Sequence, residues 1–416
     1  MWKITDLHIN LNVDRIFRYI FDHDGIFLFD NNKDGFNVVG LNVRDIYDTP
    51  AKTGNALSAL PPYVPLLGYV SFDYKDKLEE KGLFLGLSHD WFPQFGFYLF
   101  DTYLFFRNGS QSVLVVSQEN SSEQIVDLLR YSEGFDIKEK KSYYGGTSHN
   151  RSEFVAAVKK AVDYIRQGDI YQVNLTRAIY GTTEYEAWEL ASAIYKSNPI
   201  SHGVFAKIGD GFVISSSPEH FFSVKNGTIT TSPIKGTAEA TEQGLMQLLG
   251  SEKEKAELAM IVDLLRNDIN AICEPGTVVV DKFREIIKLR NVYHTYADIS
   301  GKLAKGMSFG KIVKAMFPGG SISGCPKIRA CQIIEELEGQ GRGIYTGSFG
   351  YVYPDMNMSF NIMIRSVFVK NENFIFNVGG GITMLSCPEA EFCETVHKAR
   401  NLWQALNLPE IEDEKC

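Results

Sequence analysis

Short runs of aromatic and β-branched residues separated by Asn-Gly pairs recur along the chain. Residues 96–117 read GFYLFDTYLFFRNGSQSVLVVS, and residues 221–230 read FFSVKNGTIT. Asn-Gly between two such runs is a strong local signal for a tight hairpin, because both residues accept the left-handed backbone angles of the turn. The pattern therefore predicts β-hairpins centred on Asn108-Gly109 and Asn226-Gly227.

Three longer segments carry apolar residues at helical spacing instead. They are residues 151–169, which reach a stop signal at Gly168, residues 251–272, and residues 388–407, where Pro388 suits a first helical turn. Residues 351–381 predict three antiparallel strands with polar turns at 354–357 and 371–373. Antiparallel strands mixed with helices, without regular βαβ alternation, indicate the α+β class. A polar stretch at 138–150 is typical of a boundary or an exposed connection.

Composition and charge narrow the possible functions. The chain has 416 residues, of which 44% are hydrophobic and 22% charged, as in soluble globular proteins. A formal charge of -9 gives no basic footprint for nucleic acid. No apolar run is long enough to span a bilayer, and the N-terminal residues lack a signal-peptide core, so we expect a cytoplasmic protein. The six cysteines form no C-x-x-C pair, which predicts reduced thiols and neither a zinc site nor a disulfide framework.

Two predicted helices carry acidic pairs that could hold a cation. Glu254 with Glu257, and Glu391 with Glu394, are spaced i and i+3, which puts both carboxylates of a pair on one helical face. Four carboxylates from two helices would suit Mg²⁺. For each pair alone a solvated surface is the simpler explanation, since Glu254 lies in a run of Lys and Glu and Glu394 could simply pair with Lys398.

Other segments carry candidate anion-binding groups. Arg365 lies in the apolar run NIMIRSVF, and an arginine inside a strand needs an anionic partner such as a carboxylate. The three glycines Gly379, Gly380 and Gly381 leave a strand in a turn that could direct backbone N–H groups at an anion, although a bulge is the commoner reason for such a cluster. His294 is compatible with an ordinary core histidine.

The segment TSPIKGT holds a lysine between two constrained positions. Pro233 fixes one backbone angle and Gly236 permits close approach, so Lys235 is presented on a rigid turn. For an isolated lysine, a surface position on a polar turn is the simpler explanation.

Taken together and in order, the motifs resemble the chorismate-utilising enzymes, which include anthranilate, aminodeoxychorismate, isochorismate and salicylate synthases. The matching stretches are GDIYQVNLTR (168–177), SSSPEHF (215–221), SPIKGT (232–237), AELAMIVDLLRND (256–268), FPGGSISGCPKIRA (317–330), RGIYTGSFGY (342–351), FNIMIRS (360–366), GGGI (379–382) and ETVHKAR (394–400). The resemblance implies a four-layer α/β/β/α sandwich of antiparallel sheets. It also implies an N-terminal region at 1–143, which fits the family only loosely, and a catalytic chorismate-binding region at 147–407.

The resemblance assigns roles to residues of this chain, in a cleft that holds chorismate and Mg²⁺. Glu254, Glu257, Glu391 and Glu394 match the acids of the metal site. The groups that match the holders of the substrate carboxylates are Tyr345, Arg365, Lys398 and the amides of Gly379, Gly380 and Gly381. Ser321 matches a residue that touches substrate, His294 a histidine near the ring, and Glu219 a general acid/base placed to protonate the departing 4-hydroxyl.

Two positions distinguish the family's reactions. Gln172 stands where the water-adding members have a lysine base, and a neutral amide cannot act as that base. Lys235 stands where anthranilate synthases usually have alanine, and it resembles the covalent nucleophile of aminodeoxychorismate synthases. The resemblance therefore implies conversion of chorismate and ammonia to 4-amino-4-deoxychorismate. Anthranilate formation is the alternative, and a non-catalytic relative that only binds a ligand or partner is the third.

The resemblance also bears on partners and regulation. The chain shows no glutamine-hydrolysing segment, so ammonia is expected from a separate glutaminase subunit. Relatives that bind tryptophan use two segments that correspond here to FLFDNN (27–32) and NPISH (198–202). A serine and a second proline of those segments are missing, so we expect no tight binding of tryptophan.

Overall fold

The computed structural model describes residues 2–9, 11–30, 36–118, 122–130, 138–197, 200–289 and 292–416. The helices are α1 (Val13–Asp22), α2 (Pro50–Leu57), α3 (Lys75–Leu78), α4 (Ser122–Arg130), α5 (Arg151–Gln167), α6 (Ala187–Ser197), α7 (Glu242–Gly250), α8 (Glu252–Asn270), α9 (Phe309–Met316), α10 (Lys327–Glu338) and α11 (Pro388–Ala405), with 3-10 turns η1 (Phe72–Tyr74), η2 (Gly320–Ile322) and η3 (Glu412–Glu414).

The strands are β1 (Trp2–His8), β2 (Gly25–Leu28), β3 (Asn37–Tyr47), β4 (Leu66–Val70), β5 (Phe95–Phe106), β6 (Ser112–Gln118), β7 (Ser142–Thr147), β8 (Gln172–Thr183), β9 (Val204–Ile208), β10 (Gly211–Ser215), β11 (His220–Lys225), β12 (Thr228–Thr231), β13 (Ile234–Glu239), β14 (Val279–Leu289), β15 (Val292–Lys302), β16 (Gly324–Cys325), β17 (Ser348–Val352), β18 (Met358–Asn361), β19 (Ser366–Lys370) and β20 (Asn373–Ile382).

Local sequence signals set several of these boundaries. The turn between β11 and β12 has Asn226 at φ 52° and Gly227 at φ 75°, the left-handed pair that an Asn-Gly hairpin requires. The predicted hairpin around Asn108-Gly109 joins β5 to β6. Helix α5 begins with a capping box between Asn150 and Glu153 and ends at Gly168, which is left-handed at φ 83°. The predicted helices at 251–272 and 388–407 are α8 and α11.

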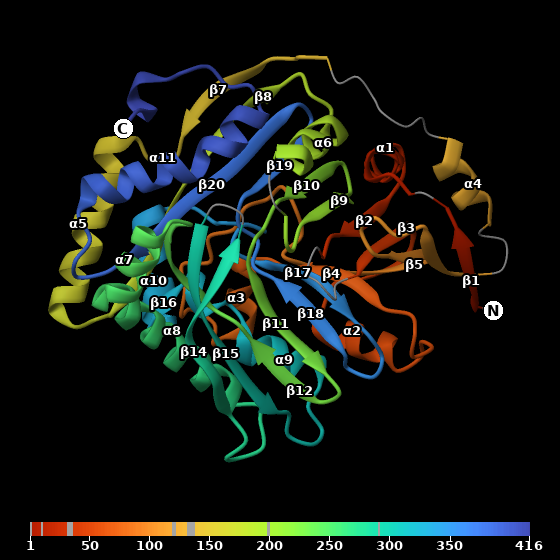
Figure 1. Ribbon diagram of the computed structural model, residues 1–416, viewed down its shortest axis with the longest axis horizontal. Helices are drawn as coiled ribbons and strands as arrows, with labels where there is room; N and C mark the ends of the chain where they lie inside the picture. Colours follow the sequence, from red (N-terminus) through yellow and green to blue (C-terminus); the bar gives the residue numbers. More distant parts are fainter. Residues whose placement is uncertain are drawn as a thin grey trace.

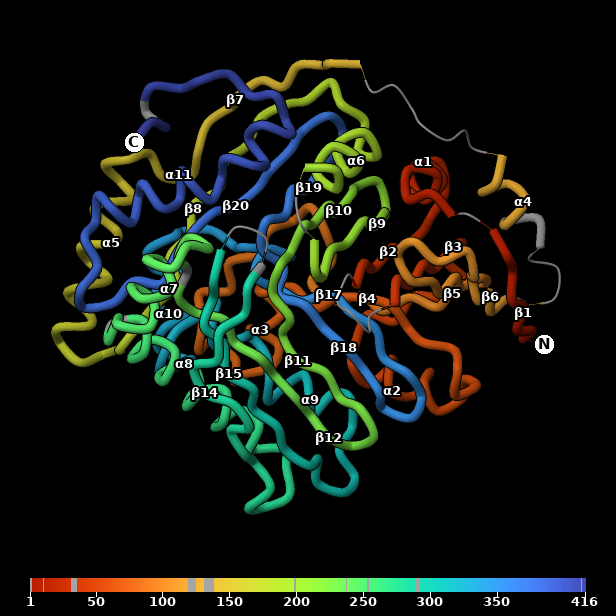
Figure 2. The backbone as a smooth tube through the Cα atoms, viewed as in Figure 1, coloured from red at the N-terminus to blue at the C-terminus, as the bar shows by residue number. Residues whose placement is uncertain are grey.

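The strand pairs are antiparallel and join into one 20-stranded network among the described residues. Strand β20 lies between β19 and β8, and β8 also pairs with β7 and β16. The strand pair β4–β17 links the N-terminal part of the chain to the C-terminal part, and β2–β9 links the N-terminal part to the middle of the chain. Figure 2 shows β4 beside β17 and β2 beside β9. The α+β class and the antiparallel sheets are confirmed; the division at residues 1–143 and 147–407 stays a prediction.

Two hydrophobic clusters fill the molecule. The larger lies among β4, β5, β11, β17 and β18 and under helices α5, α8, α9 and α10. The smaller packs α1, α6 and the C-terminal turns of α11 against β2, β3, β9, β10, β19 and β20. In Figure 1, α5 and α11 lie together beside β7, β8 and β20, near the C-terminus, and the N-terminus lies on the opposite side. None of the described helices is long and apolar enough to cross a bilayer.

Three sequence predictions need correction. The strand expected through Arg365 is interrupted: β18 ends at Asn361 and β19 begins at Ser366. The three glycines at 379–381 do not form a turn after a strand but lie inside β20, paired with β8. The polar stretch at 138–150 contains strand β7, which pairs antiparallel with β8, so this segment is part of the sheet and not only a connection.

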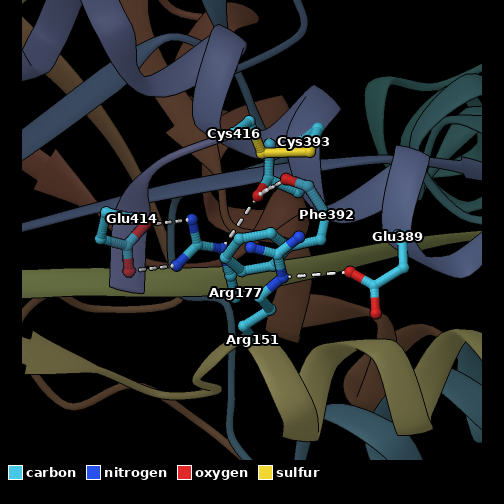
Figure 3. Close-up of a disulfide and its surroundings, with 8 residues drawn as sticks. Arg151, Arg177, Glu389, Phe392, Cys393, Glu414 and Cys416 are labelled. Carbon is cyan, nitrogen blue, oxygen red and sulfur yellow. Dashed lines mark hydrogen bonds and ion pairs between the residues drawn. A yellow bond between two sulfur atoms is a disulfide. The ribbon is translucent and has the colours of Figure 1, made fainter. Parts of the chain in front are cut away.

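The prediction of reduced thiols is wrong at one pair. Cys393 on α11 and Cys416 form a disulfide, with Cα atoms 5.5 Å apart (Figure 3). The two cysteines are 23 residues apart, and the fold of the tail after α11 brings them together. Spacing along the sequence carries no sign of this proximity. The other four cysteines are free thiols, as predicted.

Candidate active site

Glu219 is held in a rigid loop just before β11. Its backbone N–H donates to Ser217 Oγ at 3.2 Å, and its carbonyl accepts from the N–H of Ile362 at 3.0 Å. Ser217 is fully buried, and its hydroxyl also donates to the carbonyl of Ile362 at 2.6 Å. The backbone of Glu219 is therefore held by hydrogen bonds at both its N–H and its carbonyl.

The surroundings of Glu219 control its protonation. Burial raises the pKa of this carboxyl, and the positive charge of Lys235 is the strongest opposing influence. The Ser321 hydroxyl donates to Glu219 Oε1 at 2.9 Å and also lowers the pKa, as do the charges of Lys398 and Arg365. The balance leaves the pKa of Glu219 above its usual value, which favours a group that carries a proton and can donate it. Glu219 thus shares one electrostatic environment with Lys235, Lys398 and Arg365.

Lys235 lies on β13 at a β-bulge. The register between β13 and β15 shifts between Lys235 and Thr237, and Gly236 is left-handed at φ 71°. The hydroxyl of Thr295, opposite on β15, donates to the Lys235 carbonyl. Lys235 is partly buried, so the surface-turn alternative does not describe its environment.

His294 is anchored to the same bulge. Its Nδ1 lies 3.2 Å from the carbonyl oxygen of Gly236. Because a carbonyl only accepts, Nδ1 carries the proton in this bond. Burial lowers the pKa of His294, the Gly236 carbonyl opposes this, and the charge of Arg365 lowers the pKa further. The neutral imidazole is therefore favoured beside Lys235.

Arg365 sits at a sharp backbone turn between β18 and β19. It is left-handed at φ 50°, and its carbonyl accepts from the N–H and the hydroxyl of Ser216 at 3.1 and 3.2 Å. The side chain is exposed, which differs from the expected strand interior. The turn faces the guanidinium toward the shared environment of Glu219 and His294, where it can meet an incoming anion.

The glycines of β20 make room for side chains of α11. A Cβ on Gly380 would lie 3.2 Å from Glu394 Oε1, 3.6 Å from Glu391 Oε2 and 3.6 Å from Lys398 Nζ. Lys398 Nζ donates to the Gly379 carbonyl at 2.9 Å and pairs with Glu394 Oε1 at 2.6 Å. Three charged groups of α11 thus converge on one glycine.

The backbone of β20 also offers donors. Strand β19 pairs with β20 only as far as Phe376, whereas β8 pairs with β20 as far as Ile382. Successive N–H groups of a strand point to opposite edges, so alternate ones beyond Phe376 face away from β8. The predicted use of the glycine amides for an anion is compatible with this edge, although the geometry is a strand and not a turn.

The four acids predicted to bind metal lie in two pairs. Glu391 and Glu394 meet beside Gly380, and a Cβ on Gly236 would lie 3.1 Å from Glu254 Oε2, with Glu257 one turn further along α8. Carboxylate oxygens suit Mg²⁺. Across the described residues, no three His, Cys, Asp or Glu side chains come close enough to hold a metal ion, and Lys398 pairs with Glu394. The donor chemistry fits Mg²⁺, and the four-acid site stays a prediction.

Gln172 and Tyr345 are buried, with 2% and 4% of their surfaces exposed. Gln172 Nε2 would lie 2.7 Å from a Cβ on Gly381, and Gln172 Oε1 has no hydrogen-bond partner among the residues described. Burial raises the pKa of the Tyr345 phenol, so its hydroxyl is a neutral donor. Sequence reasoning assigned no role to Ser217 and Thr295, which hold the backbones of Glu219 and Lys235. Ser217 lies in the motif SSSPEHF, but its bond to Ile362 spans 145 residues, and Thr295 lies 60 residues from Lys235, so sequence spacing does not reveal either contact.

Comparison with known proteins identifies the family of this chain. Residues 17–404 match the model of the chorismate binding enzyme family. The chain belongs to the chorismate-binding enzymes. The candidate site residues described above all lie within the matched part of the chain.

Individual relatives carry two activities in their names. Anthranilate synthase component 1 of Aquifex aeolicus is 40% identical over 52% of this chain and 45% of its own length, so the match spans about half of that relative. Aminodeoxychorismate synthase component 1 of Bacillus subtilis is 31% identical over 83% of this chain and 77% of its own. The crystal structure of anthranilate synthase component I from Streptococcus pneumoniae is 27% identical, with a TM-score of 0.74 over 96% of this chain and 91% of that one. Both names recur among further relatives.

Proposed function

We propose that this chorismate-binding enzyme is an aminodeoxychorismate synthase component I, which makes 4-amino-4-deoxychorismate from chorismate and ammonia. The observation that carries the proposal is the placement of Lys235. It is fixed on a bulge by Thr295 and Gly236, and its charge is the largest one acting on the proton-donating carboxyl of Glu219. A nucleophile and an acid in one electrostatic environment are what a covalent displacement needs.

The proposed reaction has two displacements. In the first, the neutral Lys235 amine bonds to C2 of chorismate, the ring double bonds shift, and the C4–O bond breaks. Glu219 donates its proton to the departing hydroxyl, which leaves as water. In the second, ammonia bonds to C4, the double bonds shift back and the C2–N bond to Lys235 breaks. The Lys235 nitrogen leaves with the electron pair of the C2–N bond as a neutral amine. The nitrogen now on C4 gives up one proton, which restores the acid form of Glu219, and this nitrogen lies on the face that the hydroxyl left.

The remaining groups bind and orient the substrate. Tyr345, Arg365 and Lys398, with the free edge of β20, would hold its carboxylates, while Ser321 and His294 would lie near the ring. If Mg²⁺ binds, the predicted ligands Glu254, Glu257, Glu391 and Glu394 would hold it, and it would neutralise a substrate carboxylate. Gln172 cannot serve as a base for water, which favours amination over hydration. Ammonia would come from a separate glutaminase subunit, consistent with the name component 1 of the relatives.

Anthranilate formation is the second candidate. It is favoured by relatives of that name, one of which has the higher identity, although over a shorter stretch than the aminodeoxychorismate synthase. In that case Lys235 would be a bystander, and ammonia would attack the ring directly. The two reactions give different products from the same substrates.

The test is an incubation of the purified chain with chorismate, Mg²⁺ and an ammonium salt, with products separated and identified by mass. The proposal expects 4-amino-4-deoxychorismate, and expects a ring adduct on Lys235 when ammonia is left out. Lys235→Ala should abolish both while chorismate still binds. Lys225→Ala is the matched control, because Lys225 is an exposed lysine at the neighbouring hairpin. Anthranilate as the product would establish the second candidate, and no product would leave only a binding protein.

A further inference from the structure

Arg177, a buried arginine on the strand that pairs with the glycines of β20, connects the candidate active site to the C-terminal tail. Arg177 lies on β8 opposite Val378, next to the pair Thr176–Gly379, and its side chain has no exposed surface. Its Nη1 and Nη2 donate to Glu414 Oε1 and Oε2 at 2.8 and 2.6 Å. This two-bond pair supplies the negative charge that a buried guanidinium requires (Figure 3).

The same guanidinium also contacts two residues of α11. Arg177 Nε donates to Thr395 Oγ1 at 2.9 Å, and Thr395 in turn donates to the carbonyl of Phe392 at 2.7 Å. The carbon at the centre of the guanidinium lies 4.7 Å from the centre of the Phe392 ring. Arg177 therefore holds two residues of one helical turn, both of them buried.

The adjacent face of that helical turn reaches the candidate active site. Glu391 precedes Phe392, Glu394 precedes Thr395, and Lys398 lies one turn further, where it bonds to the Gly379 carbonyl. Neighbouring residues of a helix share one backbone, so a shift of Phe392 and Thr395 also moves the charged groups on the adjacent face. Arg177 thus affects the positions of Lys398 and Glu394 beside Gly380.

The tail that carries Glu414 is tied to the same helix by a covalent bond. Cys416, two residues after Glu414, is bonded to Cys393, which lies between Phe392 and Glu394. The disulfide closes a loop with its cysteines 23 residues apart, and this limits the positions that Glu414 can take. Glu414 is only 7% exposed in this arrangement.

We propose that Arg177 is a positioning residue for the active-site face of α11, and that the Cys393–Cys416 disulfide controls it by holding Glu414 on the guanidinium. The consequence for chorismate binding rests on the proposed function. With the disulfide intact, Glu414 neutralises Arg177, and Arg177 holds α11 so that Lys398 and Glu394 converge on Gly380. With the disulfide broken, the tail is released more readily, Arg177 draws water or another partner, and α11 loosens.

The switching step is a thiol–disulfide exchange with a dithiol. One thiolate of the dithiol attacks a cysteine sulfur and breaks the Cys393–Cys416 bond, and the second thiol then releases the mixed disulfide. The protein gains two electrons and two protons as two thiols, and the dithiol is oxidised to its own disulfide. Reoxidation reverses both changes.

The first experiment compares oxidised and dithiol-reduced protein, with the redox state verified by thiol alkylation and mass. Reduction should speed amide hydrogen exchange in residues 388–400 and raise the chorismate KM about tenfold, the factor that the loss of one charged hydrogen bond produces. Cys416→Ser should show the amide exchange and the KM of the reduced protein, and neither should change when the dithiol is added. Cys387→Ser is the matched control, because Cys387 is an exposed free thiol at the start of the same helix. The proposal is overturned if oxidised protein forms no Cys393–Cys416 bond, or if exchange in α11 is the same in both states.

A second set of variants separates positioning from stability. Glu414→Gln removes the charge and keeps the tail tied, and it should raise the KM, whereas Glu412→Gln, on an exposed neighbour paired with Lys415, should not. The double variant Arg177→Met with Glu414→Met removes both buried charges, so it should recover thermal stability relative to Glu414→Gln. It lacks the bond to Thr395, so its KM should stay raised. A double variant with normal stability and normal KM would show that Arg177 only balances charge.

These measurements remain informative whatever the product is. If the chain makes anthranilate, or makes nothing, the proposed function fails while the exchange in α11 and the affinity for chorismate, measured by calorimetry, still test the positioning. If the chain makes 4-amino-4-deoxychorismate with equal KM and equal exchange in both redox states, the proposed function stands and the positioning fails.

Discussion

The glycines of β20 allow a direct test of which part of the strand serves the fold and which part serves the site. A Cβ on Gly379 would overlap the backbone carbonyl of Leu175 on β8 and would lie 2.8 Å from the Cα of Thr176. Backbone in the middle of a sheet cannot move away, so Gly379→Ala should lower the free energy of unfolding by about 3 kcal/mol or more.

Gly380→Ala should behave differently. The new methyl group would meet only the ends of flexible side chains, at 3.2 Å from Glu394 Oε1 and 3.6 Å from Lys398 Nζ. Those side chains can swing away into solvent, since the side chains of Lys398 and Glu394 are 45% and 50% exposed. We expect the free energy of unfolding to change by no more than about 1 kcal/mol. Alanine restricts the backbone of the unfolded chain more than glycine does, and this stabilising effect offsets part of the cost of crowding in the folded state. We expect the chorismate KM to rise about tenfold, as Lys398 loses its place beside the substrate.

Two assays measure the pair of variants. Denaturant and thermal unfolding report the free energy, and initial rates at varied chorismate and fixed Mg²⁺ and ammonium report KM and kcat separately. Equal destabilisation by both substitutions would refute the distinction between backbone and side-chain contact. A stable Gly380→Ala protein with an unchanged KM would refute the placement of Lys398 and Glu394 at the substrate.

Three further predictions follow from the site. Activity should fall as pH rises through the raised pKa of Glu219, because the carboxyl loses the proton that it must donate. Ser321→Ala removes a hydrogen bond that favours the ionised carboxylate, so it should move this alkaline limb of the pH profile to higher pH. A limb that stays in place would contradict the assignment of Glu219 as the acid. Glu257→Gln and Glu394→Gln should abolish Mg²⁺-dependent turnover with little loss of fold, and near-normal turnover at low Mg²⁺ would show that these acids do not bind the metal. Calorimetry should find no micromolar affinity for tryptophan; the two segments concerned lie partly outside the described residues, and a micromolar affinity would disprove the expectation.

Local sequence signals determined much of the secondary structure. The Asn226-Gly227 hairpin, the end of α5 at Gly168 and the start of α11 at Pro388 each depend on backbone preferences of one or two residues, so a short window of sequence is sufficient to predict them. The spacing of Glu391 and Glu394 likewise fixed their common helical face, and the structure puts both beside Gly380. The order of the motifs was enough to indicate the chorismate-binding family.

Long-range packing decided what the sequence could not. The sequence predicted that Arg365 lies inside a strand, because its neighbours are apolar. In the structure the strand breaks there: Arg365 has a left-handed backbone at φ 50°, and its carbonyl accepts a hydrogen bond from Ser216, about 150 residues away. The glycines at 379–381 looked like a turn because glycine favours turns, whereas here the absence of a side chain lets β8 and α11 approach the same strand.

The shared environment of Glu219 and Lys235 and the disulfide between Cys393 and Cys416 have the same origin. Each joins groups whose positions are set by separate elements, so neither is encoded by any spacing along the chain. The residue types and their local conformations were available from the sequence alone. Which carboxyl keeps its proton, which lysine acts on it and which thiols bond depended on burial and on distances that exist only after the sheet has assembled, because desolvation and charge interactions act through space.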